Sequence, residues 1–179
     1  MSDEILIKSW FDNYNLPITD NQINVLLEYI NLIKESSKVM NLVSKKDIPI
    51  IADRHLLDSL YALTVYDIPL NAKAADIGSG AGFPGIPIAI ARPDLSIDLI
   101  EPRLKRSIFL QKAVNHLDLN NVEIVHKRWE NADHFYDVAL LRAVFKEKDL
   151  QKKILSLLPP DSVLLYFAKY NNINILKSI

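Results

Sequence analysis

All four glycines of this 179-residue chain lie within one stretch, DIGSGAGFPG, which runs from Asp76 to Gly85. At the usual frequency of about 7%, roughly a dozen glycines would be spread along a chain of this length. Glycine permits positive φ and lets a ligand approach the backbone closely. A tight turn without a ligand needs one or two glycines, so the cluster of four predicts a ligand-binding loop.

Short apolar runs bounded by turn residues alternate with helical patterns after Pro69, which is typical of a parallel sheet covered by helices. Strands are predicted in AKAADIG, SIDLIE, VEIVHK, YDVALLR and SVLLYFAK. Helices are predicted at about 84–92, 103–117 and 146–158, the last ending at two prolines. The glycine loop then joins the first strand to the next helix, where an open α/β sheet binds its ligands.

The first 70 residues have helical patterns instead. Ser2 is a predicted N-cap, and Thr19 with Gln22 forms a predicted capping box before an apolar stripe. NLVSKKDIPI breaks the pattern at 41–50, and a further helix is expected at about 52–66. We therefore predict an N-terminal helical extension over residues 1–70 and an α/β core over 71–179.

Composition excludes several classes of protein. The chain has no cysteine, so disulfides and cysteine zinc sites are excluded, and the spacing of its four histidines indicates no metal site. The N-terminus does not resemble a signal peptide, and no apolar run reaches the roughly 18 residues of a membrane helix. A cytoplasmic protein is expected. The net charge of −1 is not typical of a strong nucleic-acid binder, although local basic patches can still bind RNA.

The nature of the ligand can be narrowed by the acids near the loop. Gly80–Gly85 matches the GxGxxG dinucleotide pattern, and Glu101 follows at the spacing of a ribose-binding acid. The series starts earlier, however, and reads DxGxGxG from Asp76, which resembles the first motif of class I methyltransferases that use S-adenosylmethionine. An acid within the loop suits a cationic ligand better than a pyrophosphate, so the methyltransferase interpretation is preferred and a nicotinamide-dependent oxidoreductase is the alternative.

Further motifs occur in a fixed order: NLVS, RHLLDSL, DIGSGAGFPGIPIAI, LIEPRLKRSIFL, RWE and LLRAV. Together they resemble the bacterial glucose-inhibited division protein B family over about residues 10–169. Its members are guanine-N(7) methyltransferases of 16S ribosomal RNA. The resemblance implies the class I, Rossmann-like fold with a mostly parallel, doubly wound sheet, S-adenosylmethionine as the cofactor, and 16S ribosomal RNA or the small ribosomal subunit as the partner of a monomeric, cytoplasmic enzyme.

The resemblance also implies roles for individual residues. The cofactor would contact residues of the loop and of the strand ends that follow it: Asp76, Gly78, Gly80, Gly82, Phe83, Glu101, Trp129, Glu130 and Arg142. Substrate positioning would fall to Arg142, His55, Asp58 and Asn41. The family has a small residue where Trp129 stands, and only nine residues follow Tyr170 where the family continues into its final hairpin. The chain is either a natural short form or lacks its last strand.

The single residues have plainer interpretations as well. His55, Asp58 and Ser59 share one helical face. They either face the site, or His55 and Asp58 form a local hydrogen bond with a purely structural role. Neighbours on one helix do not have the geometry of a hydrolytic triad. Asn41 is either a loop polar residue or faces the substrate. Trp129 is the aromatic residue expected to stack on a base.

Basic residues at the start of the 103–117 helix point to an external anion, because cations are unfavourable at a helix N-terminus. Arg103, Lys105 and Arg106, together with Lys169, are therefore predicted to bind RNA phosphate, with simple solvation as the alternative. Methylation at guanine N7 removes no proton, so no general base is expected. A noncatalytic RNA-binding or ribosome-assembly module is the other alternative.

Overall fold

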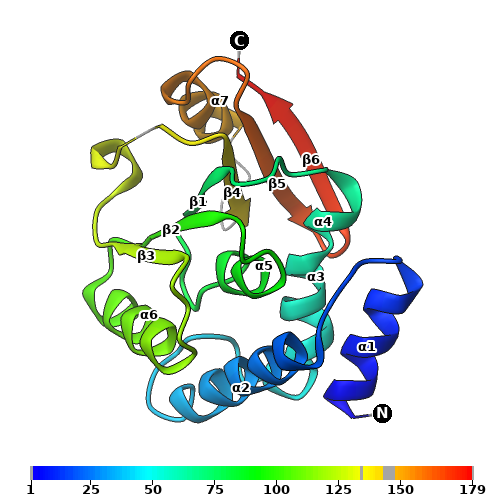
Figure 1. The fold of residues 1–179 in the computed structure, drawn as a ribbon. Coiled ribbons are helices and arrows are strands. Elements are labelled where there is room, and N and C mark those ends of the chain that lie inside the picture. Colours follow the sequence, from blue (N-terminus) through cyan, green and yellow to red (C-terminus); the bar gives the residue numbers. More distant parts are fainter. Residues whose placement is uncertain (1, 134, 143–147, 179) are drawn as a thin grey trace.

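The computed structural model describes residues 2–133, 135–142 and 148–178, without the side chains of Lys148 and Lys169. Six strands form one sheet in the order β3-β2-β1-β4-β5-β6 (Figure 1). Their bounds are β1 Lys73–Ile77, β2 Ser96–Ile100, β3 Val122–Val125, β4 Val138–Arg142, β5 Val163–Lys169 and β6 Asn172–Lys177. β1 to β5 run parallel, and β6 is antiparallel to β5. The five predicted strands are confirmed, and β6 is a strand that the apolar-run pattern missed.

The helices follow the predicted segments closely. They are α1 Asp3–Asn13, α2 Asp20–Ser36, a π-helical segment η2 Ala52–Leu57 continued by α3 Asp58–Leu60 and α4 Ala62–Val65, then α5 Gly85–Ala91, α6 Leu104–His116 and α7 Lys148–Leu157. Short 3-10 turns form at η1 Ile48–Ile50 and η3 Trp129–Asn131. Ser2 caps α1 by accepting from Ile5 N, and Thr19 with Gln22 forms the predicted capping box of α2.

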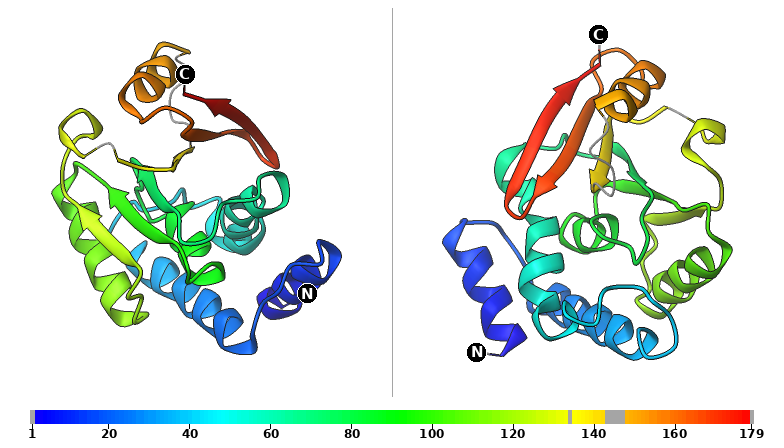
Figure 2. Two further views of the ribbon diagram at one scale, coloured as in Figure 1. Left: turned by 45° about the horizontal axis from the view of Figure 1, so that its top comes forward. Right: turned by 180° about the vertical axis from the view of Figure 1, so that it is seen from behind.

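Alternation along the strands divides the core between two faces of the sheet. On one face, Ala74, Leu140 and Leu165 pack with α1, α2, α5 and α6. On the other, Ala75 and Leu164 lie in a cluster with η3 and α7. Figures 1 and 2 show α7 across the sheet from α2, α5 and α6. Parallel strands buried on both faces are near-continuous apolar runs, which is why sequence pattern located them.

The N-terminal helices are joined to this core through buried side chains. Ile7 and Phe11 of α1 and Leu26 of α2 belong to the same hydrophobic cluster as the first face of the sheet. The division into an extension and a core at residue 70 stays a prediction. Among the described residues, none of the helices has the length and apolar character required to cross a membrane.

The last two strands form a tight hairpin. β6 pairs with β5 from Val163↔Lys177 to Lys169↔Asn172, with an irregularity between Phe167 and Lys169. Asn171 in the turn has φ +50°, a conformation that asparagine tolerates better than most residues. The turn lies beside α3 and α4 in both figures. The described residues therefore include an antiparallel edge strand, β6, beside β5.

Candidate functional site

The glycine loop has the backbone geometry that its composition predicts. Gly78, Gly80 and Gly82 have φ of +73°, +61° and +99°, which side-chain-bearing residues rarely adopt. The amides of Gly78 and Ser79 both donate to Ile100 O at the end of β2, at 2.8 and 3.3 Å. A Cβ added at Gly78 would meet no described atom within 4 Å. The loop is therefore anchored to β2 on one side and leaves room for a ligand on the other.

Asp76 supports the loop from below. Its carboxylate is 1% exposed, and Oδ2 accepts from Gly85 N at 2.9 Å, at the start of α5. A Cβ at Gly85 would lie 2.4 Å from Leu99 Cδ2, so only glycine allows this approach. Burial raises the pKa of Asp76 to about 7, although the Gly85 N–H opposes the shift. The predicted contact of Asp76 with the cofactor stays a prediction. In the structure the carboxyl group accepts a hydrogen bond that joins the loop to the start of α5.

Glu101 faces the loop from the end of β2. Its side chain is 2% exposed, Oε2 accepts from Gly80 N at 2.9 Å, and Oε1 accepts from Arg103 N at 2.8 Å. A carboxylate held by two backbone amides beside open glycines fits the expected ribose acceptor of a nucleoside-containing cofactor. These residues therefore suit S-adenosylmethionine chemically.

A tyrosine that sequence reasoning missed holds the loop from α2. Tyr29 is fully buried, and its hydroxyl donates to Ala81 O at 2.8 Å. Phe83 packs 5.3 Å from the Tyr29 ring and stacks on His55 at 5.4 Å, between centroids. Phe83 is only 6% exposed, so it anchors the loop instead of lining an open cofactor pocket as the resemblance implied. No local sequence signal marks Tyr29, because its helix carries an ordinary apolar stripe.

Arg142, at the end of β4, clamps the π-helical segment η2. Its Nη1 donates to His55 O and Ser59 Oγ, and its Nη2 donates to Arg54 O and to Asp58 Oδ2 at 2.5 Å. Burial lowers the pKa of Arg142, and Asp58 opposes this shift. The carbonyls that Arg142 reaches belong to a π-helical segment, and such turns are frequent at functional sites. Arg142, His55 and Asp58, which the resemblance assigns to substrate positioning, thus lie in one place, and that role stays a prediction.

A local hydrogen bond between His55 and Asp58 was considered as the alternative to a site role. Among the described residues, these two side chains do not form it. Asp58 is 2% exposed and is shared between Arg142 and the backbone amide of Asn171, which donates to Oδ1 at 2.7 Å. The ring of His55 turns the other way, with Nε2 3.3 Å from Asp47 Oδ2. Burial and the charge of Arg142 lower the pKa of His55, so its imidazole is neutral near neutral pH. The i, i+3 spacing suggested a local pair, but tertiary partners were available to both side chains.

A cavity of about 270 Å³ opens next to this clamp, at the carboxyl ends of β4 and β5. It is lined by Asp47, Arg54, His55, Asp58, Arg142, Phe167, Ala168 and Tyr170. His55, Asp58 and Arg142 were predicted site residues. Arg54 belongs to the RHLLDSL motif but was not assigned a role, and the other lining residues come from segments without a recognised motif. Asp47 keeps its charge, since its neighbours Ser44, His55 and Arg54 together outweigh burial and lower its pKa. The cavity adjoins the glycine loop through the His55–Phe83 stack.

The remaining predicted residues lie around the same edge of the sheet. Arg103 and Lys105 are exposed at the start of α6, and Arg106 is half-buried with Nη1 3.5 Å from the position of a Cβ on Gly80. His126 joins this group, its ring nitrogen 3.1 Å from Pro102 O. The side chain of Lys169 lies outside the described residues. The basic residues of the β2–α6 and β3–η3 connections thus share one rim.

Two predicted cofactor contacts are placed differently. Trp129 is 6% exposed and packs 6.0 Å from Tyr136, so it is not an accessible stacking platform. Glu130 pairs with Lys153 of α7 at 3.0 Å, and its predicted contact with the cofactor stays a prediction. Asn41 is exposed, and within the described ranges no hydrogen bond of its side chain is seen. In the same ranges, no cluster of three His, Asp or Glu side chains could hold a metal ion.

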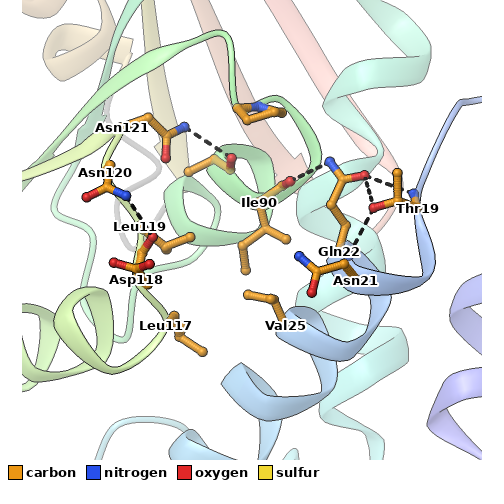
Figure 3. Close-up of a pocket in the computed structure, with 12 residues that line it drawn as sticks. Thr19, Asn21, Gln22, Val25, Ile90, Leu117, Asp118, Leu119, Asn120 and Asn121 are labelled. Carbon is orange, nitrogen blue, oxygen red and sulfur yellow. Dashed lines mark hydrogen bonds between the residues drawn. The ribbon is translucent and has the colours of Figure 1, made fainter.

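A larger cavity, of about 630 Å³, lies away from this edge, between the start of α2, the end of α5 and the α6–β3 loop (Figure 3). Gln22 Nε2 donates to Ile90 O at 2.8 Å and Asn121 Nδ2 to Ala89 O at 3.1 Å. These amides satisfy carbonyls at the end of α5, where a helix leaves acceptors free. The polar groups of this cavity therefore hold elements together, and the chemistry is assigned to the edge with the glycine loop.

Comparison with solved structures identifies the fold. A putative S-adenosyl-L-methionine-dependent methyltransferase from Methanococcus maripaludis aligns with a TM-score of 0.59 and 21% identity, over 80% of this chain and 64% of that one. Coclaurine N-methyltransferase, solved with N-methylheliamine and S-adenosylhomocysteine, aligns with a TM-score of 0.56 and 14% identity, over 91% and 58%. The fold is that of class I methyltransferases, as predicted.

Sequence relatives are closer. Ribosomal RNA small subunit methyltransferase G of Desulforamulus reducens is 38% identical over 83% of this chain and 64% of its own length. The enzyme of Nocardioides sp. is 36% identical over 81% of this chain and 58% of its own length. The enzyme of Wolinella succinogenes is 36% identical over 90% of this chain and 82% of its own length. The chain thus spans about three fifths of the length of the first two relatives. The family model for rRNA small subunit methyltransferase G matches residues 22–178. This chain belongs to the rRNA small subunit methyltransferase G family, the family that its sequence motifs resemble.

Proposed function

We propose that this protein transfers a methyl group from S-adenosylmethionine to N7 of a guanine in small-subunit ribosomal RNA. The observation that carries the proposal is the open glycine loop beside the buried carboxylate of Glu101, next to a polar cavity at the ends of β4 and β5. Family membership supports the same reaction. A cytoplasmic, monomeric enzyme that acts on 16S RNA or on the small-subunit particle belongs to this proposal.

S-adenosylmethionine would supply an activated methyl group on a sulfonium for an in-line displacement. In this protein, Glu101 would accept from the ribose hydroxyls, and Gly78 and Gly80 would let the ligand lie against the backbone. Glu101 now accepts from Gly80 N, so binding would share or replace that hydrogen bond. Asp76 would keep the loop in shape by accepting from Gly85 N, and Tyr29 of α2 would do so by donating to Ala81 O.

The acceptor guanine would enter the cavity beside Arg142. Guanine N7 attacks with a lone pair and loses no proton, so the side chains there need only position the base. This agrees with a neutral, buried His55 and with an Arg142 whose terminal nitrogens are all used in holding η2. The exposed cations Arg103 and Lys105 would bind phosphates of the RNA, which weakens with salt.

Calorimetric titration with S-adenosylhomocysteine, run beside NAD, is the test to make first. We expect binding at a Kd of about 10 µM or tighter for the homocysteine form and none for NAD, because acids beside the loop disfavour a pyrophosphate. Binding would then justify a methyl-transfer assay on small-subunit RNA and on the assembled particle, with N7-methylguanine as the product measured.

Each other outcome favours a different function. Binding of NAD alone would point to the oxidoreductase suggested by the GxGxxG match. Salt-dependent RNA binding without methyl transfer, in the presence of bound cofactor, would point to a noncatalytic assembly module. A product methylated elsewhere on the base would keep the enzyme class and overturn the N7 assignment.

A further inference from the structure

One aromatic side chain at the cavity beside Arg142 has no role in the function proposed above. Tyr170 lies in the β5–β6 turn, lines that cavity and is 50% exposed. The opposite side of the cavity comes from residues 47–58, more than a hundred positions earlier in the chain. The hairpin turn and the η2 segment therefore face each other across the opening.

The Tyr170 ring is held in place from both sides. Its hydroxyl donates to Asp53 Oδ1 at 2.5 Å, and the next residue, Asn171, donates its amide to Asp58 Oδ1 at 2.7 Å. Burial and the hydrogen bond to Asp53 raise the pKa of Tyr170 to about 12, so the hydroxyl stays protonated and keeps donating. A half-exposed ring fixed at its tip and at its backbone is a preorganised planar surface.

The cavity has the size and composition that a single nucleobase needs. Its volume of about 270 Å³ is slightly below the roughly 300–1,000 Å³ of pockets for drug-sized ligands. Phe167 and Ala168 supply apolar walls. Asp47 and Arg54 pair with each other at 3.3 Å through Arg54 Nε, and the largely exposed guanidinium of Arg54 has further N–H donors for the edge of a base. The groups of Asp58 and Arg142 are already paired with each other.

We propose that Tyr170 is the stacking platform for the acceptor base, a positioning role that rests on the methyl-transfer function proposed above. RNA-binding proteins stack splayed-out bases on aromatic side chains, and each such contact contributes about 1–3 kcal/mol. Trp129, the aromatic residue predicted for this task, is buried on the second face of the sheet. Tyr170 offers an exposed ring at the cavity where the base must lie.

The test compares two substitutions that both remove the hydrogen bond to Asp53. Tyr170→Phe keeps the aromatic face, and Tyr170→Leu replaces it by a non-planar apolar side chain. Binding of a guanine-containing single-stranded RNA oligonucleotide is measured in the presence of S-adenosylhomocysteine, together with kcat and KM for methyl transfer to small-subunit RNA. Phe135→Ala is the matched control, because Phe135 is 80% exposed and lies outside the cavity.

We expect Tyr170→Leu to weaken RNA binding about tenfold and to raise KM more than it lowers kcat, within the range of one stacked base. Tyr170→Phe and Phe135→Ala should stay within about twofold of the wild type, and the affinity for S-adenosylhomocysteine should be the same in all four proteins. Equal losses in the Phe and Leu variants would overturn the platform and assign Tyr170 to fastening the hairpin.

The two proposals fail in different ways. If the wild type methylates RNA and Tyr170→Leu binds and reacts normally, the platform is overturned and the proposed function stands. If RNA binding depends on the Tyr170 ring but the wild type transfers no methyl group, Tyr170 is supported as a stacking platform for an RNA base, and the proposed methyl transfer is removed. A wild type that binds no RNA overturns the platform.

Discussion

The two halves of the sheet's carboxyl edge are built in different ways. The glycine loop, Asp76–Gly85, is shaped by positive φ at its glycines and by hydrogen bonds that mostly lie within some 25 residues of sequence, with Tyr29 of α2 as a more distant donor. The cavity beside Arg142 is assembled from residues 47–58, the end of β4 and the β5–β6 turn. Its central contact, Arg142 with Asp58, joins positions 84 apart.

The two halves are therefore expected to respond differently to substitutions. The loop depends on the absence of side chains at its glycines, so a substitution at a glycine strains the backbone and obstructs the ligand. The cavity depends on charged groups that neutralise one another in a buried place. Such groups become costly when one partner is removed, since the other remains buried without compensation. We therefore expect the loop to be sensitive chiefly in binding and the clamp chiefly in stability.

The largest effect is expected from Arg142→Met. It would leave the Asp58 carboxylate, 2% exposed, without its cation, and it would remove one hydrogen-bond donor from each of the carbonyls of Arg54 and His55. We expect the free energy of unfolding to fall by about 3 kcal/mol and Tm by about 6–12 °C, measured by urea and thermal denaturation.

Arg54→Met is the control for that substitution, because the Arg54–Asp47 pair involves a side chain that is 59% exposed. An exposed pair contributes about 0–1 kcal/mol, so this variant should be close to the wild type. Adding Asp58→Leu to Arg142→Met should recover part of the loss. If Arg142→Met and Arg54→Met had equal free energies of unfolding, the Arg142–Asp58 pair would not be buried as described.

Gly80→Val should have the next largest effect, on binding. A branched side chain at φ +61° is strained by about 1–2 kcal/mol, and it would also stand beside Arg106 and in the path of the ligand. We expect calorimetry to show at least a tenfold loss of affinity for S-adenosylhomocysteine, with helical content by circular dichroism unchanged. Gly80→Ala should lose less, and an unchanged affinity in both variants would contradict the role given to the loop.

Measured per pH unit, the smallest effect is a pH dependence of the free energy of unfolding that originates in Asp76. Its folded pKa of about 7 lies above the ordinary value of 3.8, so the folded state favours the protonated form. The stability that it contributes is therefore complete below about pH 4 and is lost as the pH rises towards 7. Asp76→Asn keeps a carbonyl acceptor for Gly85 N and removes the titration.

Urea denaturation of both proteins at pH 5, 6, 7 and 8 would measure this dependence. The stability of the wild type should fall relative to Asp76→Asn by at most about 1.4 kcal/mol per pH unit up to pH 7, and the two should run parallel above it. Other titrating groups cancel in the difference. Parallel behaviour across the whole range would mean that Asp76 is solvated instead of buried.

Most of the fold could be predicted from the sequence because its signals are local. Buried parallel strands are short apolar runs, and the caps at Ser2 and Thr19 depend on residues three positions away. The antiparallel β6 was missed because it alternates only weakly and lies at an exposed edge of the sheet. Its pairing is decided by the turn at Asn171, not by its own composition.

Sequence alone was sufficient to predict the glycine loop, the acid that follows it and the succession of strands and helices along the chain, since each depends on backbone conformation or on nearby residues. Tertiary structure alone decided that Tyr29 holds the loop, that Asp58 pairs with Arg142 instead of His55, and that Tyr170 borders the cavity. A buried polar group takes whichever partner the fold brings within reach, and sequence spacing carries no record of partners that lie 50 to 120 positions away.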